Sequence, residues 1–329
     1  MAGRRTNLAL SAALATALIS GGLAFGVGSS WSRLVVAAHG ALGLTVLLLS
    51  PWKSVIARRG LRRARPGRAS SMTLSLMVVV VVLTGISHAT GVAVSLGPVS
   101  AMQVHVGVAL AAMPLALWHV VRRPQRVHRA DLSRRNALRA GALVGAGGIA
   151  YLGIEGASRA LSLPGAKRRT TGSYEAGSSR PEEMPVTQWL FDDVPAIEPV
   201  AWSLRVRDRT FGYEELAAYE DTVRATLDCT GGWYAHQEWS GVRLDRLLDG
   251  GGRSIAVTSA TGYRRLLPTS AAADLLLALR VGGRPLSAGH GFPARIVAPG
   301  RRGFWWVKWV ASIEPSDIPW WLQPPFPLQ

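Results

Sequence analysis

The first 160 residues alternate between long apolar runs and short polar connections. The apolar runs cover about residues 7–27, 31–50, 71–94, 98–121 and 138–158. Each run approaches the roughly 20 residues that an α-helix needs to cross a bilayer. The pattern therefore predicts an α-helical transmembrane bundle of five spans.

Beyond residue 160 the apolar runs become short and are separated by Gly and Pro. Ala201–Val206 and Ser254–Ser259 are two examples of this pattern. Short runs bounded by turn residues are typical of strands, so we predict an α+β, β-rich second domain. Within it we expect short helices at Gly212–Leu216, Arg243–Leu248 and Ala271–Leu279.

The net charge of +17 belongs to the first half of the chain. Residues 1–170 hold 21 Lys and Arg against two acids, whereas residues 171–329 hold 16 basic and 18 acidic residues. The basic residues fall between apolar runs, which is typical of the flanks of membrane spans and not of a nucleic-acid groove. We therefore expect a lipid bilayer as partner and no nucleic acid.

The charged connections also predict an orientation. The stretches 1–7, 51–70 and 122–139 are rich in Arg, whereas 28–30 and 95–97 carry no charge. By the positive-inside rule the N-terminus is cytoplasmic, and five crossings place the C-terminal domain outside. We expect a multi-pass protein of the plasma membrane.

The fifth apolar run begins with Ser133-Arg134-Arg135-Asn136-Ala137-Leu138-Arg139 and continues as a weakly apolar, Gly-rich stretch. This start resembles a twin-arginine export signal, here inside the chain. The alternative is that Arg134 and Arg135 are ordinary positive charge on the cytoplasmic side. No small-residue cleavage site follows, so we expect the span to remain as an anchor.

Four histidines lie within or at the ends of the predicted spans, namely His39, His88, His105 and His119. Ionisable side chains are costly there, so each is a functional candidate. His39, His88 and His105 are expected at one depth near the outer face. His119 follows His105 by 14 residues, which is close to four helical turns, so both lie on one helix face.

This spacing resembles that of the helix in bis-histidine b-type cytochromes that ligates two stacked haems, one in each leaflet. For an outer haem the best pair is His39 with His105, and His88 is the competing ligand. His119 lacks a partner at its own depth, so we expect one haem b. The alternative is that these histidines are hydrogen-bonded residues of a purely structural anchor.

Cys229 is the only cysteine of the chain, so no intramolecular disulfide is possible. It follows a predicted strand and precedes Gly231 and Gly232, where the backbone can approach a ligand closely. A soft thiolate is a suitable metal donor. Taken alone, the position also suits a buried and inert thiol.

Four sequence blocks lie around and after Cys229, namely Cys229–Trp233, Trp239–Leu244, His290–Gly300 and Val307–Val310 with Ile313–Glu314. In this order they resemble the sulfite oxidase family of molybdopterin enzymes. The resemblance runs through about residues 185–316 and implies a β-rich, sulfite-oxidase-like molybdopterin domain.

The resemblance also implies roles for single residues. Cys229 would ligate molybdenum, while His290, Arg295 and Lys308 would hold the pterin and its phosphate. Arg offers a planar fork and Lys a point charge to phosphate oxygens, so these residue types suit the task.

Two tyrosines are carried over on shorter matches. The segment Thr171–Ser178 is similar to the one that closes over the pterin in bacterial periplasmic methionine sulfoxide reductases of the same family, which implies cofactor contact by Tyr174. Tyr263 is the candidate active-site tyrosine, or else an aromatic residue at a turn.

The apolar runs and the sequence blocks together predict three parts of the chain. They are a membrane domain at 1–160, a linker and pterin-covering segment at 161–184, and a molybdopterin-binding oxidoreductase domain at 185–329.

Several cationic side chains near these blocks remain open to two interpretations. They would supply positive charge to an anionic substrate, or they are solvated surface positions: His236, Arg264, Arg265, Arg301 and Arg302. The run Phe304-Trp305-Trp306 departs from the family pattern and changes the expected rim of the pocket.

Together these features predict a membrane-anchored molybdopterin-dependent oxidoreductase that acts outside the cytoplasm. It would exchange an oxygen atom and electrons with a small sulfoxide or sulfite-like substrate, and exchange electrons with the membrane quinone pool through a b-type haem. The alternative is a catalytically inactive, membrane-tethered binding or assembly module that keeps the fold.

Overall fold

The computed structural model describes residues 2–29, 31–61, 68–93, 95–96, 99–188 and 193–324. The chain divides into two compact units. The helical unit comprises residues 1–25 and 30–172, and the sheet unit comprises residues 26–29 and 173–329. The division at residue 172 falls inside the predicted linker.

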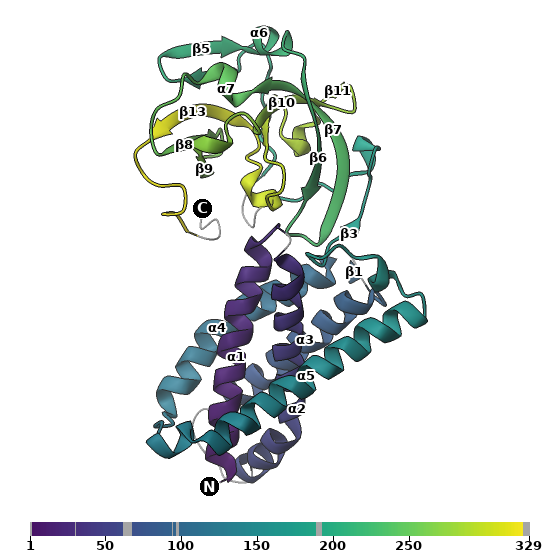
Figure 1. Ribbon diagram of the computed structural model, residues 1–329, viewed down its shortest axis with the longest axis vertical. Coiled ribbons are helices and arrows are strands. Elements are labelled where there is room, and N and C mark those ends of the chain that lie inside the picture. The colour runs from purple at the N-terminus through teal and green to yellow at the C-terminus, as the bar shows by residue number, and fades with distance from the viewer. Residues whose placement is uncertain are drawn as a thin grey trace. The chain divides into compact units, whose positions relative to one another are not determined.

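Five long helices make up most of the helical unit (Figure 1). They are α1 Ala2–Gly26, α2 Ser32–Leu61, α3 Arg68–Thr90, α4 Ala101–Arg122 and α5 Arg134–Ala160. Each contains a stretch long and apolar enough to cross a membrane. The predicted five apolar helices are therefore confirmed as helices.

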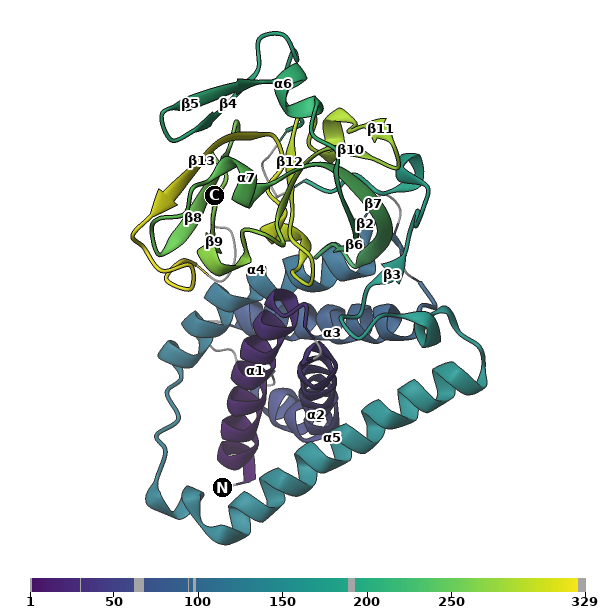
Figure 2. The ribbon, with the colours of Figure 1, turned by 45° about the horizontal axis from the view of Figure 1, so that its top comes forward.

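The helices pack in pairs, α3 against α4 and α2 against α5 (Figure 2). The short strands β1 Ser95–Leu96 and β2 Val99–Ser100 join α3 to α4. Ser100 then begins α4 with a capping box, because its side chain accepts from the Gln103 backbone while the Gln103 side chain accepts from the Ser100 backbone. Two 3₁₀ turns flank α5, namely η1 Arg129–Leu132 and η2 Pro164–Lys167.

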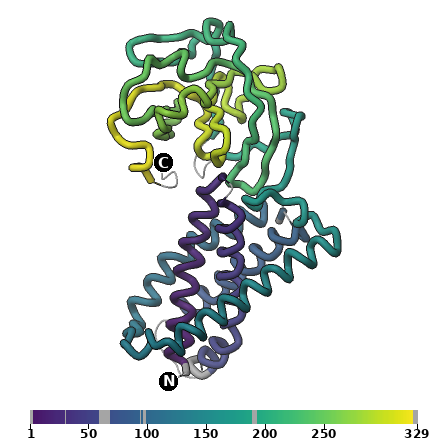
Figure 3. The backbone as a smooth tube through the Cα atoms, viewed as in Figure 1, coloured from purple at the N-terminus to yellow at the C-terminus, as the bar shows by residue number. Residues whose placement is uncertain are grey.

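The sheet unit contains two sheets, and Figure 3 follows its chain path. The six-stranded sheet has the order β11-β10-β7-β3, with β12 paired to β10 and β6 to β7. Its strands are β3 Tyr174–Glu175, β6 Asp221–Asp228, β7 Trp233–Arg243, β10 Leu276–Val281, β11 Arg284–Pro285 and β12 Arg295–Val297. The five-stranded sheet has the order β5-β4-β13-β8-β9 and contains β4 Ser203–Val206, β5 Arg209–Gly212, β8 Ser254–Ser259, β9 Arg264–Pro268 and β13 Val310–Ser316.

Short helical segments connect these strands. They are η3 Pro181–Glu183, α6 Tyr213–Ala217, α7 Leu244–Leu247, η4 Thr269–Ala271, η5 Ala288–His290 and η6 Gly303–Trp305. The α+β, β-rich character of this part is thereby confirmed, and α6 and α7 match two of the predicted short helices.

The predicted helix at Ala271–Leu279 is wrong. After η4 the chain enters β10, which pairs with β7 on one side and with β12 on the other. Residues 275–279 are all buried, because the strand lies inside the sheet and is covered on both faces. A short, continuous apolar run does not distinguish such a strand from a buried helix.

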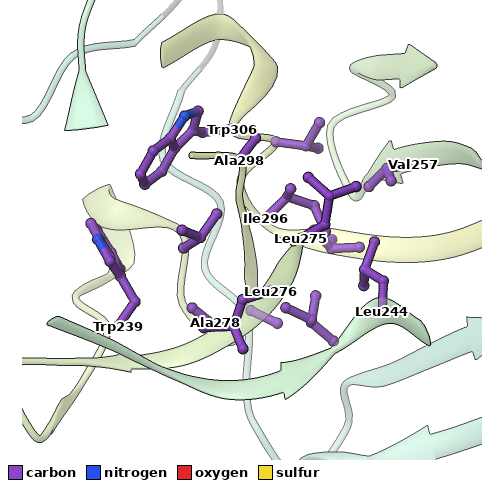
Figure 4. Close-up of a cluster of buried hydrophobic side chains, with 14 of the residues drawn as sticks. Trp239, Leu244, Val257, Leu275, Leu276, Ala278, Ile296, Ala298 and Trp306 are labelled. Atoms are coloured by element: carbon purple, nitrogen blue, oxygen red, sulfur yellow. The ribbon is translucent and has the colours of Figure 1, made fainter. Parts of the chain in front are cut away.

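A hydrophobic core contains buried side chains from the strands of both sheets (Figure 4). Trp239 of β7 meets Trp306 edge to face, with ring centroids 5.5 Å apart. Leu276 and Ile296, from paired strands, complete the packing near them. The core fixes the strand ends from which the candidate site is built.

Candidate functional site

Cys229 occupies the tight turn between β6 and β7. Its backbone N–H donates to the Trp233 carbonyl at 2.8 Å, and the Gly232 N–H donates back to the Cys229 carbonyl at 3.2 Å. Gly232 adopts a φ of 94°, which favours glycine at this position. The Gly231 N–H lies 3.4 Å from the thiol sulfur, and the residue is 9% exposed.

A cavity of about 110 Å³ opens beside this thiol. Four segments line it: residues 185–188, the turn at 227–233, the loop at 259–263 and the stretch 290–309. Of the predicted site residues, the cavity brings together Cys229, Tyr263, His290, Arg295 and Lys308. Residues more than 60 positions apart thus share one site, as the order of the sequence blocks predicts.

Tyr174 is not among the residues that line this cavity. It lies on β3 and pairs in parallel register with Trp233, directly beside the Cys229 turn. The segment predicted to cover the pterin therefore flanks the turn through its backbone.

Arg295 is fully buried at the cavity wall, with 1% exposure. It donates to the His290 carbonyl at 3.0 Å and its guanidinium lies over the rings of Trp239 and Trp306. Burial lowers the pKa of Arg295 to about 10, while the Cys229 thiol acts in the opposite direction. Its Nε has no hydrogen-bond partner among the described residues. A buried guanidinium without a carboxylate partner suits an anionic ligand in the cavity.

His290 is also buried at the cavity, and burial here favours the neutral form of the side chain. Burial, followed by the charges of Arg295 and Lys308, lowers its pKa to about 4, although the backbone at Met184 and Pro185 opposes the shift. The Ser287 hydroxyl lies 2.7 Å from its Nδ1. The imidazole is therefore neutral near pH 7 and offers hydrogen bonding without charge.

Lys308 closes one side of the cavity. Its ammonium donates to the Thr187 carbonyl at 2.9 Å, to the Gln188 side-chain oxygen at 3.1 Å and to the Gly289 carbonyl at 2.7 Å. It therefore holds residues 187–188 against the cavity, and binding a phosphate would exchange one of these bonds.

Tyr263 also lines the cavity, where its hydroxyl donates to the Phe304 carbonyl at 2.5 Å. Apart from Arg295, Lys308 and the neutral His290, the described lining is uncharged and includes three tryptophans. The side chains available around the thiol are thus mostly aromatic rings, hydroxyls and amides.

Sequence reasoning missed that two of the basic residues are buried. Arg302 pairs with Asp228 behind the Cys229 turn, and Arg265 lies over the rings of Phe304 and Trp305. Solvation is therefore the wrong interpretation for these two. Arg264 and His236 are exposed, and Arg301 stacks on Trp305 and Trp320. The signal for Arg302 was the acid next to the single cysteine, because a buried carboxylate needs a cation.

The helical unit brings two of its histidines together. The rings of His39 and His105 lie 5.8 Å apart, centroid to centroid, at an interplanar angle of 87°. His39 Nδ1 is 3.0 Å from the Ala17 carbonyl and His105 Nδ1 is 2.8 Å from the Val81 carbonyl. A ring that donates from Nδ1 keeps the Nε2 lone pair for a metal.

The other two candidates have different partners. His88 Nε2 is 2.9 Å from the Gly172 carbonyl, and His119 Nδ1 is 3.4 Å from the Ser71 hydroxyl. The described parts of the chain contain no cluster of three or more His, Cys, Asp or Glu side chains suited to a metal ion.

The sheet unit is similar in sequence to known proteins. A family model described as an oxidoreductase molybdopterin binding domain matches residues 191–320. The mitochondrial sulfite oxidase of Homo sapiens is 27% identical over 169 residues, which cover 38% of this chain and 31% of that protein. The sulfite oxidase of Gallus gallus is 30% identical over 172 residues, with 38% of each chain covered.

Among solved structures, the sulfane dehydrogenase SoxCD from Paracoccus pantotrophus aligns with a TM-score of 0.36 at 25% identity, over 38% of this chain and 40% of that chain. The chain spans about a third of the length of the curated relatives that it matches. The sheet unit thus contains a molybdenum-dependent, molybdopterin-binding oxidoreductase domain.

Proposed function

We propose that this oxidoreductase domain binds a molybdenum-pterin cofactor through Cys229 and works at the outer face of the plasma membrane, anchored there by the five helices. The observation that carries the proposal is that Cys229 shares one cavity with Tyr263, His290, Arg295 and Lys308. An inert core cysteine would instead be surrounded by apolar side chains alone.

The residues present fit a molybdenum-pterin group. A lone thiol at a glycine turn supplies the protein's soft donor, and the buried Arg295 supplies charge for an anionic cofactor. The neutral His290 would offer the group a hydrogen bond, and Lys308 would give up one of its present acceptors to bind a phosphate oxygen. When bound, the group supplies two-electron oxygen-atom transfer, and the protein's task is to hold it and to orient substrate.

The substrate is a small molecule of the sulfoxide or sulfite type. The cavity of about 110 Å³ is small, and the aromatic side chains of Trp233, Phe304 and Trp309 form part of its lining. The Tyr263 side chain lines this cavity, and its hydroxyl would have to leave the Phe304 carbonyl to donate to a substrate oxygen. A screen of sulfoxides, sulfite and N-oxides with an artificial electron carrier distinguishes these classes and the direction of the reaction.

The membrane anchor is supported by the surface of the helical unit. Large apolar side chains such as Leu76, Leu83, Ile149 and Leu152 are exposed along α3 and α5. Such surfaces are costly in water and favourable in lipid. With the Arg-rich connections inside, the sheet unit lies outside the cytoplasm, and the Ser133–Arg139 start of α5 serves its export.

The same proposal includes one haem b between His39 and His105. The two rings lie 5.8 Å apart, centroid to centroid, and each Nδ1 is near a backbone carbonyl, which leaves both Nε2 atoms for a metal. The haem would carry single electrons between the quinone pool and the sheet unit.

The decisive experiment is metal analysis of the full chain, purified in detergent from a host that makes the cofactor. We expect about one molybdenum per chain, and loss of most of it in Cys229→Ser, because the thiolate is the protein's ligand. The matched control is Ser240→Ala, on the neighbouring strand β7 and away from the cavity lining. If wild type and Cys229→Ser both lack molybdenum, the chain is a membrane-tethered binding module instead.

A further inference from the structure

A buried ion pair lies directly behind the turn that carries Cys229. Asp228, the preceding residue, pairs through Oδ1 with Arg302 Nη1, and the two side chains are only 6% and 4% exposed. The Ser173 hydroxyl donates to the same carboxylate oxygen at 2.6 Å. Neither charged residue lines the cavity, so the pair stands apart from the cationic groups that face the cofactor.

The same arginine also holds the cysteine's backbone. Arg302 Nη2 donates to the Cys229 carbonyl at 3.3 Å. The backbone segments at Asp228 and Arg302 also form an isolated parallel β-bridge. A Cβ at Gly303 would lie 3.1 Å from the Cys229 Cα, so the two segments are in close contact. One guanidinium thus engages a side chain and a main chain on either side of the Cys229 amide.

Stability alone does not explain such a pair. Burying two charges costs several kcal/mol, and an apolar pair of similar volume is often as stable or more stable. What an ion pair adds is direction, because the planar guanidinium binds its acceptors in a fixed fork. Here the guanidinium orients Cys229, the residue that would ligate the metal.

We propose that Asp228, Arg302 and Ser173 are positioning residues that fix the direction of the Cys229 thiolate. This rests on the proposed function, in which that thiolate binds molybdenum. The cysteine is held from behind through its carbonyl while its sulfur faces the cavity.

The test uses full-length protein in detergent, with molybdenum content, the line shape of the Mo(V) electron paramagnetic resonance signal, and turnover of a sulfoxide or sulfite. In Arg302→Gln we expect an altered and broadened signal and a fall in kcat of about 10- to 100-fold, with KM within about twofold, because misplacing a reacting group by about 1 Å has effects of that size. Asp228→Asn should act in the same direction. The matched control is Arg301→Gln, the adjacent arginine that stacks on Trp305 and Trp320.

The double variant Asp228→Asn/Arg302→Gln separates positioning from stability. It leaves no lone buried charge, so its melting temperature should recover relative to the single variants. The spectrum and kcat should stay altered, because nothing holds the Cys229 carbonyl. Recovery of the wild-type spectrum and kcat in the double variant would show that the pair is only structural and overturn the proposal.

Molybdenum content distinguishes the two levels of the argument. Wild-type protein without molybdenum contradicts the proposed function, and the positioning role with it. Wild-type protein with molybdenum and an Arg302→Gln variant with an unchanged signal contradict the positioning role alone. If Arg302→Gln does not fold, Arg302→Lys and the double variant still decide, since both avoid an unpaired Asp228.

Discussion

The sheet unit assembles its candidate site from four separate stretches of chain, whereas the helical unit offers one imidazole from each of two helices. In the sheet unit a buried arginine, a neutral histidine and a thiol meet in a cavity. In the helical unit the rings of His39 and His105 are each held by a backbone carbonyl. The first site is defined by several residue types, and the second depends on spacing between helices alone.

This difference determines what kind of observation supports each site. Motif blocks identify the sheet-unit site, because glycine turns and cationic residues at fixed spacing carry specific chemistry. A single histidine in a helix does not by itself indicate a metal site. It does so only with a partner on another helix, and the partner is known only when the packing of the helices is known. The two sites should therefore respond independently to mutation, and the predictions below address that independence.

The largest expected effect is loss of haem in His105→Ala. Dithionite-reduced wild type should show b-type absorption bands, and the variant should show none, since one of two axial ligands is gone. Molybdenum content should stay unchanged. His119→Ala, on the same helix, is the control and should keep its bands. A colourless wild type would remove haem from the proposal and leave the molybdenum site untouched.

A smaller effect is expected from glycines that face the two rings. A Cβ at Gly21 would lie 2.9 Å from His39 Cε1, and one at Gly85 would lie 3.1 Å from His105 Cε1. Overpacking of this kind costs about 1–3 kcal/mol, so Gly21→Ala and Gly85→Ala should retain haem at least about fivefold less well.

Gly107→Ala is the matched control for this pair, because no atom lies within 4 Å of a Cβ there. It should keep its haem and gain helix propensity. Equal haem content in all three variants, measured as pyridine haemochrome, would show that the rings do not need this space.

The smallest effect concerns the pH dependence of His290. Its pKa is lowered from 6.5 to about 4, so the unfolded chain takes up this proton more readily than the folded chain between those values. The stability linked to neutral His290 is complete above about pH 6.5 and is lost as the pH falls toward 4.

Between pH 6.5 and 5 the melting temperature of wild type should therefore fall by a few degrees more than that of His290→Gln. The exposed His236→Gln is the control and should follow wild type. Parallel melting curves for wild type and His290→Gln would contradict the assignment of a neutral buried imidazole.

Much of this architecture was predictable because it depends on local sequence patterns, namely apolar runs and short blocks of residues at fixed spacing within this chain. Five apolar runs gave five helices, and Cys229 with its glycines lies at the predicted end of a strand. His290, Arg295 and Lys308 lie in ordered blocks, and the structure brings all three to the same cavity.

What was not predictable depends on contacts across the fold. Nothing in the dipeptide Arg301-Arg302 distinguishes the stacked arginine from the buried one, because the distinction comes from Asp228 on a distant strand. Likewise the apolar run at 275–279 reveals its strand only through β7 and β12 on either side. The sequence favoured His39 over His88 as the partner of His105, but it did not show that His88 engages the Gly172 carbonyl.

The three bonds of Lys308 bear on how the protein matures. Lys308 joins residues that lie 121 positions apart, so this contact forms only after most of the sheet unit has folded. Until then the cavity is open on the side of residues 187–188. We therefore expect the cofactor to enter the sheet unit at a late stage of folding. Lys308 would then bind residues 187–188 and close the cavity over the cofactor.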